Sequence, residues 1–409
     1  MRHVDKPSKE LIKLVVDNAD GNPFYAEELI KMMIDRKIIS TDLDTWAVNE
    51  SRLVDFQVPG SLSGVLQARF DQLSSIEKST LQYASVIGFE FWAEALEELE
   101  DEKIRETILK SLRAKEIIYR HENSVFKNAS EYVFKHALFR DVVYETILLR
   151  NRKQLHQNVA TWLVKKSVNL KNDNAPMIAE HFENAELYSQ ASEWFGNAGD
   201  FARKTNSPEA AKQYFSNALK LSEKHKESER NIPKELEWRK RLGNALHRLA
   251  KFDEAIEEFG HLLKEAGKIG DANYQAEACL GLSFANLENG DNRKALETAI
   301  RISEIIPSEE KDIEREILKA KGLYRKARAL YSLGEYAEVV KLGKKVLDQS
   351  KNFDRRGAKV LANSYHILAA ANMTLGRFDE AFDFESREIE LSRSIDDTKT
   401  VANGLNSLG

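Results

Sequence analysis

Apolar residues recur at helical spacing along most of the chain. In SKELIKLVVDNAD, residues 11, 12, 14, 15 and 16 are apolar, and Ser8 precedes them as a candidate N-cap. Gly21-Asn22-Pro23 then interrupts the pattern, and FYAEELIKMMIDRKII resumes it as far as residue 39. The pattern predicts two helices joined by a tight turn, which is too short a segment to form a domain alone.

The second stretch of the chain, residues 58–166, predicts further helices. Pro59 opens SLSGVLQARFDQLSSIEKSTLQYASVIGFEF, which we interpret as two helices with a break near Leu73-Ser74-Ser75. A third helix is predicted over 103–114. A single long amphipathic helix is predicted over 137–165.

A strand-favouring segment separates the last two of these helices. EIIYR (116–120) and EYVFK (131–135) are rich in β-formers and predict a hairpin. Helices followed by a small hairpin are the element order of a winged-helix domain. Residues 103–166 hold 14 Lys and Arg against 6 Asp and Glu, whereas the whole chain has a net charge of -5. Because basic helices bind DNA, a DNA-binding transcription regulator is one alternative, although the acidic remainder would repel phosphates and makes nucleic acid a disfavoured partner.

From residue 176 onward the sequence repeats. Each copy has a small or β-branched residue in its second helix, and successive copies are 44, 40, 44 and 42 residues apart: Ala211, Ala255, Ala295, Val339 and Ala381. Twelve residues earlier lies a second series of small residues: Gly199, Gly243, Ser283, Ala327 and Ala369. Five residues before the reference are the predicted turns, at Asn206, Ala250, Gly290, Gly334 and Gly376. Three before are Pro208, Phe252, Asn292, Tyr336 and Phe378.

The repeat pattern has a packing explanation. Two helices of a hairpin need small residues where they touch, and bulky residues are expected where one hairpin meets the next. The pattern resembles the tetratricopeptide repeat (TPR), whose usual period is 34 residues, so a longer period implies longer helices. HEAT-type repeats share this period, but the turn glycines argue against them. TVANGLNSLG at the end matches the first half of another copy. We predict a mainly α fold with five TPR-like repeats and a truncated sixth over 176–409, in a fragment of a longer protein.

Four phrases resemble signal-transduction ATPases with numerous domains (STAND), an AAA-like family that includes bacterial adenylate or guanylate cyclases and Ser/Thr kinases. They are GNPFYAEELI (21–30), VPGSLSGVLQARFDQLSSIEKSTLQYASVIGFEF (58–91), EYVFKHALFRDVVYETILLRNRKQLHQNVA (131–160) and IAEHFENAELYSQASEWFGNAGDFA (178–202). The resemblance implies that residues 1–40 are the last piece of an ATPase helical subdomain. It also implies a winged-helix domain over 58–166 and a repeat sensor after it.

The resemblance also bears on nucleotide binding. Gly21 and Pro23 match a Gly-x-Pro turn that packs against the nucleotide in that family, although an ordinary interhelix turn is the favoured interpretation because this sequence lacks the rest of the nucleotide site. No GxxxxGK[ST] phosphate loop occurs in the chain, so ATP hydrolysis by this chain is not expected. ATP or ADP is expected only in an upstream ATPase module, and no cofactor is expected here. A cyclase or kinase whose catalytic domains lie upstream remains a second alternative.

Other chemistry is limited by residue content. Cys279 is the single cysteine, which excludes an internal disulfide or a cysteine zinc site and predicts an apolar filler on a helix. No histidine belongs to an HExxH motif, and no catalytic or metal site is predicted. Carboxylate pairs such as Glu27-Glu28 are interpreted as solvent-exposed side chains on helix surfaces. No apolar run reaches the ~18 residues of a membrane span, and a cytoplasmic protein is predicted.

One sharper hypothesis concerns the groove formed by the first helices of the repeats. Lys240 and Asn244 of one repeat, with Lys321 and Arg325 two repeats later, resemble the carboxylate clamp by which chaperone-binding TPR domains hold a peptide C-terminus. Three cations and one amide can bind a carboxylate by charge-assisted hydrogen bonds. Gly281 departs from that pattern, because the clamp uses Asn there.

A broader set of groove residues would suit a peptide of any sequence: Asn244, Arg248, Tyr324, Arg328 and His366. The predicted function is therefore a non-catalytic sensor that binds a protein or peptide in the groove and relays that state through the winged helix to upstream ATPase or effector domains.

Overall fold

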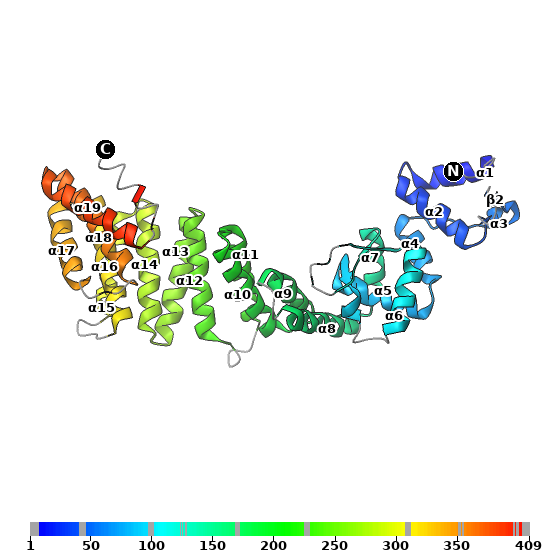
Figure 1. Ribbon diagram of the computed structural model, residues 1–409, viewed down its shortest axis with the longest axis horizontal. Coiled ribbons are helices and arrows are strands. Elements are labelled where there is room, and N and C mark those ends of the chain that lie inside the picture. The colour runs from blue at the N-terminus through cyan, green and yellow to red at the C-terminus, as the bar shows by residue number, and fades with distance from the viewer. Residues whose placement is uncertain are drawn as a thin grey trace. The chain divides into compact units, whose positions relative to one another are not determined.

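The structure is a computed structural model, shown in Figure 1. It describes residues 8–40, 46–96, 102–122, 124, 126, 129–167, 172–224, 230–306, 312–350, 353, 356–395, 397 and 401–402. The chain divides into two compact units: unit 1 comprises residues 1–171 and 180–187, and unit 2 comprises residues 172–179 and 188–409. One helix, α9 (Ala175–Asn184), contributes residues to both units. The fold is mainly α, as predicted.

Unit 1 begins with two helices, α1 (Lys9–Ala19) and α2 (Pro23–Asp35). Ser8 caps α1, because its hydroxyl accepts a hydrogen bond from the Leu11 amide at 3.3 Å. Asp20 ends the helix in the left-handed conformation. Both helices bury apolar faces in one core that also contains Leu53 and Val65 from later elements, so this segment packs onto the chain that follows it.

The end of α2 differs from the prediction. The helical pattern extends to residue 39, but α2 ends at Asp35, and Ile39–Ser40 (β1) pairs with Ala47–Val48 (β2). Lys37 has a φ of 55°, which takes the backbone out of the helix. The apolar Ile38 and Ile39 are buried in both interpretations, so periodicity alone could not place the boundary.

The next helices of unit 1 follow the sequence closely. A short helix, α3 (Glu50–Val54), leads to α4 (Leu62–Asp71) and α5 (Ser75–Ile87). The predicted break at residues 73–75 is confirmed, since Ser74 and Glu77 form a reciprocal capping box at the start of α5. The predicted third helix is α6 (Glu102–Ala114).

A small antiparallel sheet packs with these helices. The predicted hairpin is confirmed, because β4 (Ile118–Arg120) pairs with β5 (Glu131–Phe134) in the register Tyr119↔Val133. A strand that the sequence analysis did not predict, β3 (Glu90–Trp92), pairs with the other edge of β5, giving the order β3-β5-β4. The strand leads into a short 3-10 helix, η1 (Ala93–Leu96).

The predicted long helix over 137–165 is wrong in one respect, because it is two helices. They are α7 (Ala137–Glu145) and α8 (Leu149–Ser167). The Arg152 guanidinium donates to the carbonyls of Glu145 at 3.0 Å and Ile147 at 2.9 Å, so carbonyls at the end of α7 have partners outside the helix. A side chain from the following helix therefore stabilises a break that the apolar period does not reveal.

Unit 2 is a stack of helical hairpins in chain order (Figure 1). A 3-10 turn, η2 (Asn172–Asn174), precedes α9. The hairpins are α10 (Tyr188–Lys204) with α11 (Pro208–Ser222), α12 (Ile232–Arg248) with α13 (Phe252–Lys268), α14 (Ala272–Glu288) with α15 (Asn292–Ile305), α16 (Ile313–Ser332) with α17 (Tyr336–Ser350), and α18 (Ala358–Thr374) with α19 (Phe378–Ser394). First helices also contact one another, α12 with α14, α14 with α16 and α16 with α18. We call the side formed by these four helices the first-helix face.

The aligned turn positions are confirmed by backbone geometry. All five predicted turn residues have a positive φ between 55° and 86°: Asn206, Ala250, Gly290, Gly334 and Gly376. The residues aligned two positions after these turns are each the first residue of a second helix: Pro208, Phe252, Asn292, Tyr336 and Phe378. The repeat pattern in the sequence therefore corresponds to the same turn made five times.

Small residues lie at two kinds of contact. Within hairpins, a Cβ on Gly199 would lie 2.6 Å from the Phe215 ring, and one on Gly243 would lie 2.5 Å from the Phe259 ring. Glycines also lie between successive hairpins, where Gly281 meets Phe259 and Gly322 meets Ile302. Bulky residues therefore lie at these junctions as expected, and each large side chain also needs a glycine on the neighbouring helix, which was not expected.

The truncated sixth repeat lies outside the described residues, apart from residues 397 and 401–402. In the described part of the chain, no helix has the length and apolar character needed to span a membrane. Cys279 is buried in an apolar cluster, as predicted, and this burial raises the pKa of its thiol to about 11.

Candidate functional site

The structure brings two of the predicted clamp residues to one pocket on the first-helix face. Lys240 on α12 and Lys321 on α16 both line a cavity of about 380 Å³, and Tyr274 and Glu277 of α14 lie between those helices in the same wall. The first helices of three successive hairpins thus contribute to one site, although the two lysines are 81 positions apart in the sequence.

Lys240 is held in place by its neighbours. Its ammonium lies 2.7 Å from the Glu237 carboxylate and 5.4 Å from the centre of the Tyr274 ring. The Tyr274 hydroxyl donates a hydrogen bond to Glu237 at 3.0 Å. Burial opposes ionisation of Glu237, but its contacts with Lys240 and Arg241 outweigh burial and lower its pKa. Glu237 therefore stays ionised and holds Lys240 at the pocket wall.

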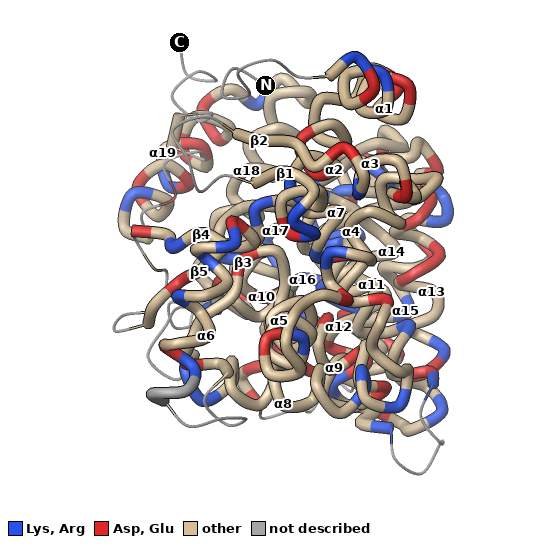
Figure 2. The backbone as a smooth tube through the Cα atoms, turned by 90° about the vertical axis from the view of Figure 1, so that its right-hand side faces the viewer, with Lys and Arg blue, Asp and Glu red and all other residues tan. Residues whose placement is uncertain are grey.

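The pocket carries both signs of charge. Its basic side chains are Lys240, Lys321 and Arg356, and its acidic ones are Asp271, Glu277 and Glu314. Arg356 lies 3.3 Å from Glu314, and Asp271 caps α14 by accepting from the Tyr274 amide. Along the chain as a whole, Lys and Arg positions are also interspersed with Asp and Glu positions (Figure 2). Such a wall suits a peptide segment with polar groups of both kinds better than a single carboxylate.

The other two clamp residues do not line this pocket. Asn244 is exposed on α12, and the Arg325 guanidinium lies 4.6 Å from the Phe284 ring and 5.9 Å from the Tyr324 ring. Burial lowers the pKa of Arg325. The geometry therefore gives Arg325 a packing contact, and the four-residue clamp stays a prediction.

The remaining predicted groove residues have separate surroundings. Arg248 donates to the Asn206 side chain in the turn of the preceding hairpin. Tyr324 packs against the apolar cluster that contains Ala327 and Leu330, and Arg328 is half-buried. The contact of Arg248 with Asn206 joins neighbouring repeats, which a single repeat in the sequence does not reveal.

His366 lines a different pocket, of about 490 Å³, at the last described hairpin. Its Nδ1 atom lies 3.2 Å from Glu388, and this hydrogen bond raises the pKa of His366. Phe378 and Phe382 line the same pocket and are 64% and 61% exposed. Of the predicted groove residues, Lys240 and Lys321 thus line one pocket and His366 lines another.

Two groups of described side chains have the composition of metal ligands, although no metal site was predicted. They are Glu27 with Glu28 and His136, and His366 with Glu385 and Glu388. In the first group, Lys31 and Lys135 already bind the Glu27 carboxylate at 2.6 and 2.9 Å. In the second, His366 hydrogen-bonds to Glu388. In each group, some of these side chains are therefore already hydrogen-bonded or ion-paired.

Gly21 and Pro23 form the turn between α1 and α2. Gly21 has a φ of 76°, and the Asn22 side chain caps α2 by accepting from the amides of Phe24 and Tyr25. Pro23 lines a cavity of about 810 Å³ together with Ile30, Lys31 and other residues of unit 1. The turn chemistry accounts for Gly21, and a nucleotide contact stays a prediction.

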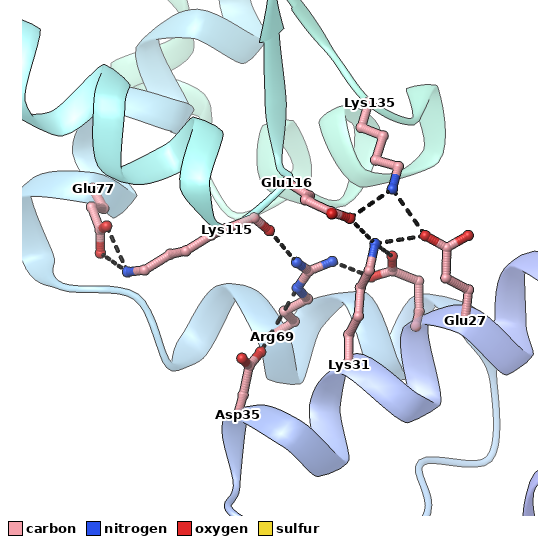
Figure 3. A network of polar contacts seen from close by, with 9 residues as sticks. Glu27, Lys31, Asp35, Arg69, Glu77, Lys115, Glu116 and Lys135 are labelled. Carbon is pink, nitrogen blue, oxygen red and sulfur yellow. Dashed lines mark hydrogen bonds and ion pairs between the residues drawn. The ribbon is translucent and has the colours of Figure 1, made fainter. Parts of the chain in front are cut away.

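A charged cluster that no sequence motif indicated connects α2 to the sheet (Figure 3). Lys31 and Lys135 each contact both Glu27 and Glu116, at distances between 2.6 and 3.0 Å. Hydrogen bonds from the two lysines lower the pKa of both carboxyl groups to about 2. These four residues come from α2, the turn before β4 and the end of β5, so spacing along the chain could not reveal the cluster.

A buried ion pair lies beside this cluster. Arg69 on α4 contacts Glu28 at 2.5 Å and donates to the Lys115 carbonyl at 2.5 Å (Figure 3). Glu28 is fully buried, so its interpretation as a solvated surface residue is wrong. Lys115 in turn binds Glu77 at 2.6 Å.

Many cations of the basic segment 103–166 have acidic partners. Examples are Lys110 with Glu106, Arg152 with Glu145, and Lys153 with Glu186. Pairing of this kind reduces the positive charge available to a phosphate backbone. The net charge of the segment is therefore a poor guide to a DNA-binding face.

A tetratricopeptide repeat family model matches residues 195–225. The fold over these residues is TPR-like. The matched residues run from α10 through the turn at Asn206 and to the end of α11, which is the first aligned copy. No curated protein matches the sequence.

Several solved structures are similar at low identity. BtubC (BKLC) from P. vanneervenii is 14% identical with a TM-score of 0.44, over 61% of this chain and 93% of that chain. The STAND protein with a tetratricopeptide repeat sensor PH0952 from Pyrococcus horikoshii is 15% identical with a TM-score of 0.38, over 98% of this chain. This chain spans only 59% of the length of PH0952. MamA from residue 41 onward, from Desulfovibrio magneticus RS-1, is 17% identical with a TM-score of 0.36, over 50% and 97% of the two chains. At these values no property of those proteins transfers to this chain.

Proposed function

We propose that this chain is a non-catalytic sensor or scaffold that binds a protein or peptide segment along the first-helix face of its TPR-like repeats. The observation that carries the proposal is the pocket shared by Lys240 of α12 and Lys321 of α16. A site built from three successive hairpins can follow an extended ligand, because each hairpin adds one helix to a continuous surface.

In this proposal the binding state passes from the repeats over 176–409 through a winged-helix domain over 58–166 to an upstream ATPase and effector. Residues 1–40 are then the last piece of the ATPase module, and ATP or ADP is bound upstream rather than by this chain. The charged contacts between α2 and the elements around the sheet support a relay, because displacement of α2 would break the two ion pairs that join it to them, Lys31 with Glu116 and Lys135 with Glu27.

We expect a double substitution in the pocket to reduce peptide binding. Peptides selected against the full chain from a random display library should lose at least about tenfold in affinity, or ~1.4 kcal/mol, in the Lys240→Ala/Lys321→Ala variant. Lys268→Ala/Lys294→Ala is the matched control, since both lysines are exposed on second helices. Fluorescence anisotropy with labelled peptides measures both variants.

Two results would contradict the proposal. One is a set of selected peptides that bind the Lys240→Ala/Lys321→Ala variant as tightly as the native chain, and the other is a selection that yields no binding peptide. Amidation of the peptide C-terminus tests the clamp separately, because only a clamp requires the terminal carboxylate.

A further inference from the structure

Two histidines lie side by side inside unit 1, away from the repeat pocket. His156 on α8 and His181 on α9 are 4% and 6% exposed, and their Nδ1 atoms are 2.8 Å apart. The Tyr144 hydroxyl of α7 lies 2.9 Å from His156 Nε2. His181 also hydrogen-bonds to the backbone of Ile87, the last residue of α5. These hydrogen bonds form a continuous chain through four helices.

The positions of the protons in this series of hydrogen bonds follow from the groups at its two ends. The bond to Ile87 favours the charged form of His181, so the backbone group is the carbonyl and His181 donates to it. Its Nδ1 atom must then accept, which makes His156 Nδ1–H the donor in the contact between the two rings. His156 Nε2 accepts from the Tyr144 hydroxyl. Both rings are therefore neutral, and each ring nitrogen of the two histidines has one hydrogen-bond partner.

The positive charges near the rings oppose protonation of the two histidines. Arg140 of α7 and Arg152 of α8 lie 5.0 and 4.5 Å from the centre of the Tyr144 ring. On α5, residues 79–87 carry no charged side chain. On α9, Glu180 and Glu183 flank His181 in sequence, and burial raises the pKa of Glu180.

The direction of the histidine pKa shifts agrees with this environment. Burial, with Arg140 and Arg152, lowers the pKa of His156 to about 4. Burial and the neighbouring His156 lower the pKa of His181 to about 3. A histidine released to solvent titrates near 6.5, so the released state binds protons more readily than the packed state.

We propose that the chain Tyr144–His156–His181–Ile87 is a proton-sensitive latch that holds residues 180–187 against α5, α7 and α8, and that acidification opens it. A proton added at either ring replaces an acceptor by a donor, so an N–H would point at another donor. Because α9 contributes residues to both units, opening releases its second half from unit 1. The latch closes fully above pH 6.5 and weakens as the pH falls from 6.5 toward 4.

Hydrogen exchange of the full chain tests the latch. After correction for intrinsic exchange rates, we expect protection of residues 180–187 to stay constant from pH 7.5 to 6.5. Between pH 6.5 and 5.5 it should fall by about fivefold for each histidine that takes up a proton on release. Peptides from α12 and α13 serve as the internal reference. Constant protection in α9, or an equal loss in the reference peptides, would overturn the proposal.

Two variants separate the latch from general acid unfolding. Tyr144→Phe removes the donor to His156 Nε2, so protonation there no longer breaks a bond, and the loss of α9 protection between pH 6.5 and 5.5 should be smaller than in the native chain. His156→Gln/His181→Gln removes both titrating rings, so α9 protection should not change between pH 6.5 and 5.5, whatever its level. If that variant fails to fold, Tyr144→Phe decides the question.

The control variant is His261→Gln, because His261 is exposed on α13. It should behave as the native chain does. A loss of α9 protection in Tyr144→Phe as large as in the native chain would contradict the latch, and so would an undiminished pH dependence in the double variant.

Discussion

Replacing Arg69 by methionine is expected to reduce the free energy of unfolding of unit 1 by about 3–5 kcal/mol. The substitution leaves the Glu28 carboxylate fully buried without the guanidinium that contacts it at 2.5 Å. It also removes the hydrogen bond to the Lys115 carbonyl. Urea denaturation, followed by hydrogen exchange of the α2 and α4 peptides, measures the loss in unit 1.

A second variant distinguishes the buried charge from packing. Glu28→Leu/Arg69→Met replaces both charges by apolar groups, and such replacements of a whole buried pair are often close to neutral. We therefore expect the double variant to be more stable than Arg69→Met alone. Lys110→Met, which breaks the exposed pair with Glu106, should change stability by less than about 0.5 kcal/mol. An Arg69→Met variant as stable as Lys110→Met would refute the role of the buried pair.

Gly243→Val is expected to destabilise unit 2 by about 3 kcal/mol, because it overfills a packed junction. A Cβ at residue 243 would lie 2.5 Å from the Phe259 ring. The ring is 1% exposed and meets Gly281 of the next hairpin as well, so it has no free space into which it can move. Thermal and urea denaturation followed by circular dichroism would report the change.

The neighbouring Gly260 offers a matched control on α13. A Cβ there would meet nothing within 4 Å, so Gly260→Val should be close to neutral. Shortening the opposing side chain by Phe259→Leu should recover part of the stability of Gly243→Val but destabilise the otherwise native chain. A Gly243→Val variant with native stability would contradict the close approach of α12 and α13.

The repeat architecture was predictable because its requirements are local. A left-handed turn residue such as Gly290, a helix start such as Phe252 and a small contact residue such as Gly243 recur at fixed offsets. Each offset records a steric condition within one hairpin, so comparison of copies reveals it. The hairpin of β4 and β5 was predictable for a similar reason, since both strands lie within one short segment.

The candidate site was predictable only in part. Assigning each residue of the first helices to a position that faces the groove or faces away from it was enough to select Lys240 and Lys321. The structure places both in one pocket. The same rule also selected Arg325, whose guanidinium instead lies over the Phe284 ring. Spacing predicts the side of a helix on which a residue lies, but the neighbouring hairpin decides whether that residue is available to a ligand.

The sequence by itself determined the mainly α fold, the number and phase of the described repeats, and the turns between their helices, because these depend on conditions that act over a few residues. Only the tertiary structure decided the pairing of Arg69 with Glu28 and the contact of His156 with His181. It also decided where α7 ends, because the Arg152 side chain donates hydrogen bonds to the carbonyls of Glu145 and Ile147 there. Each of these depends on packing that brings together groups from different helices, and a buried charge or ring nitrogen needs a partner wherever that partner lies in the chain.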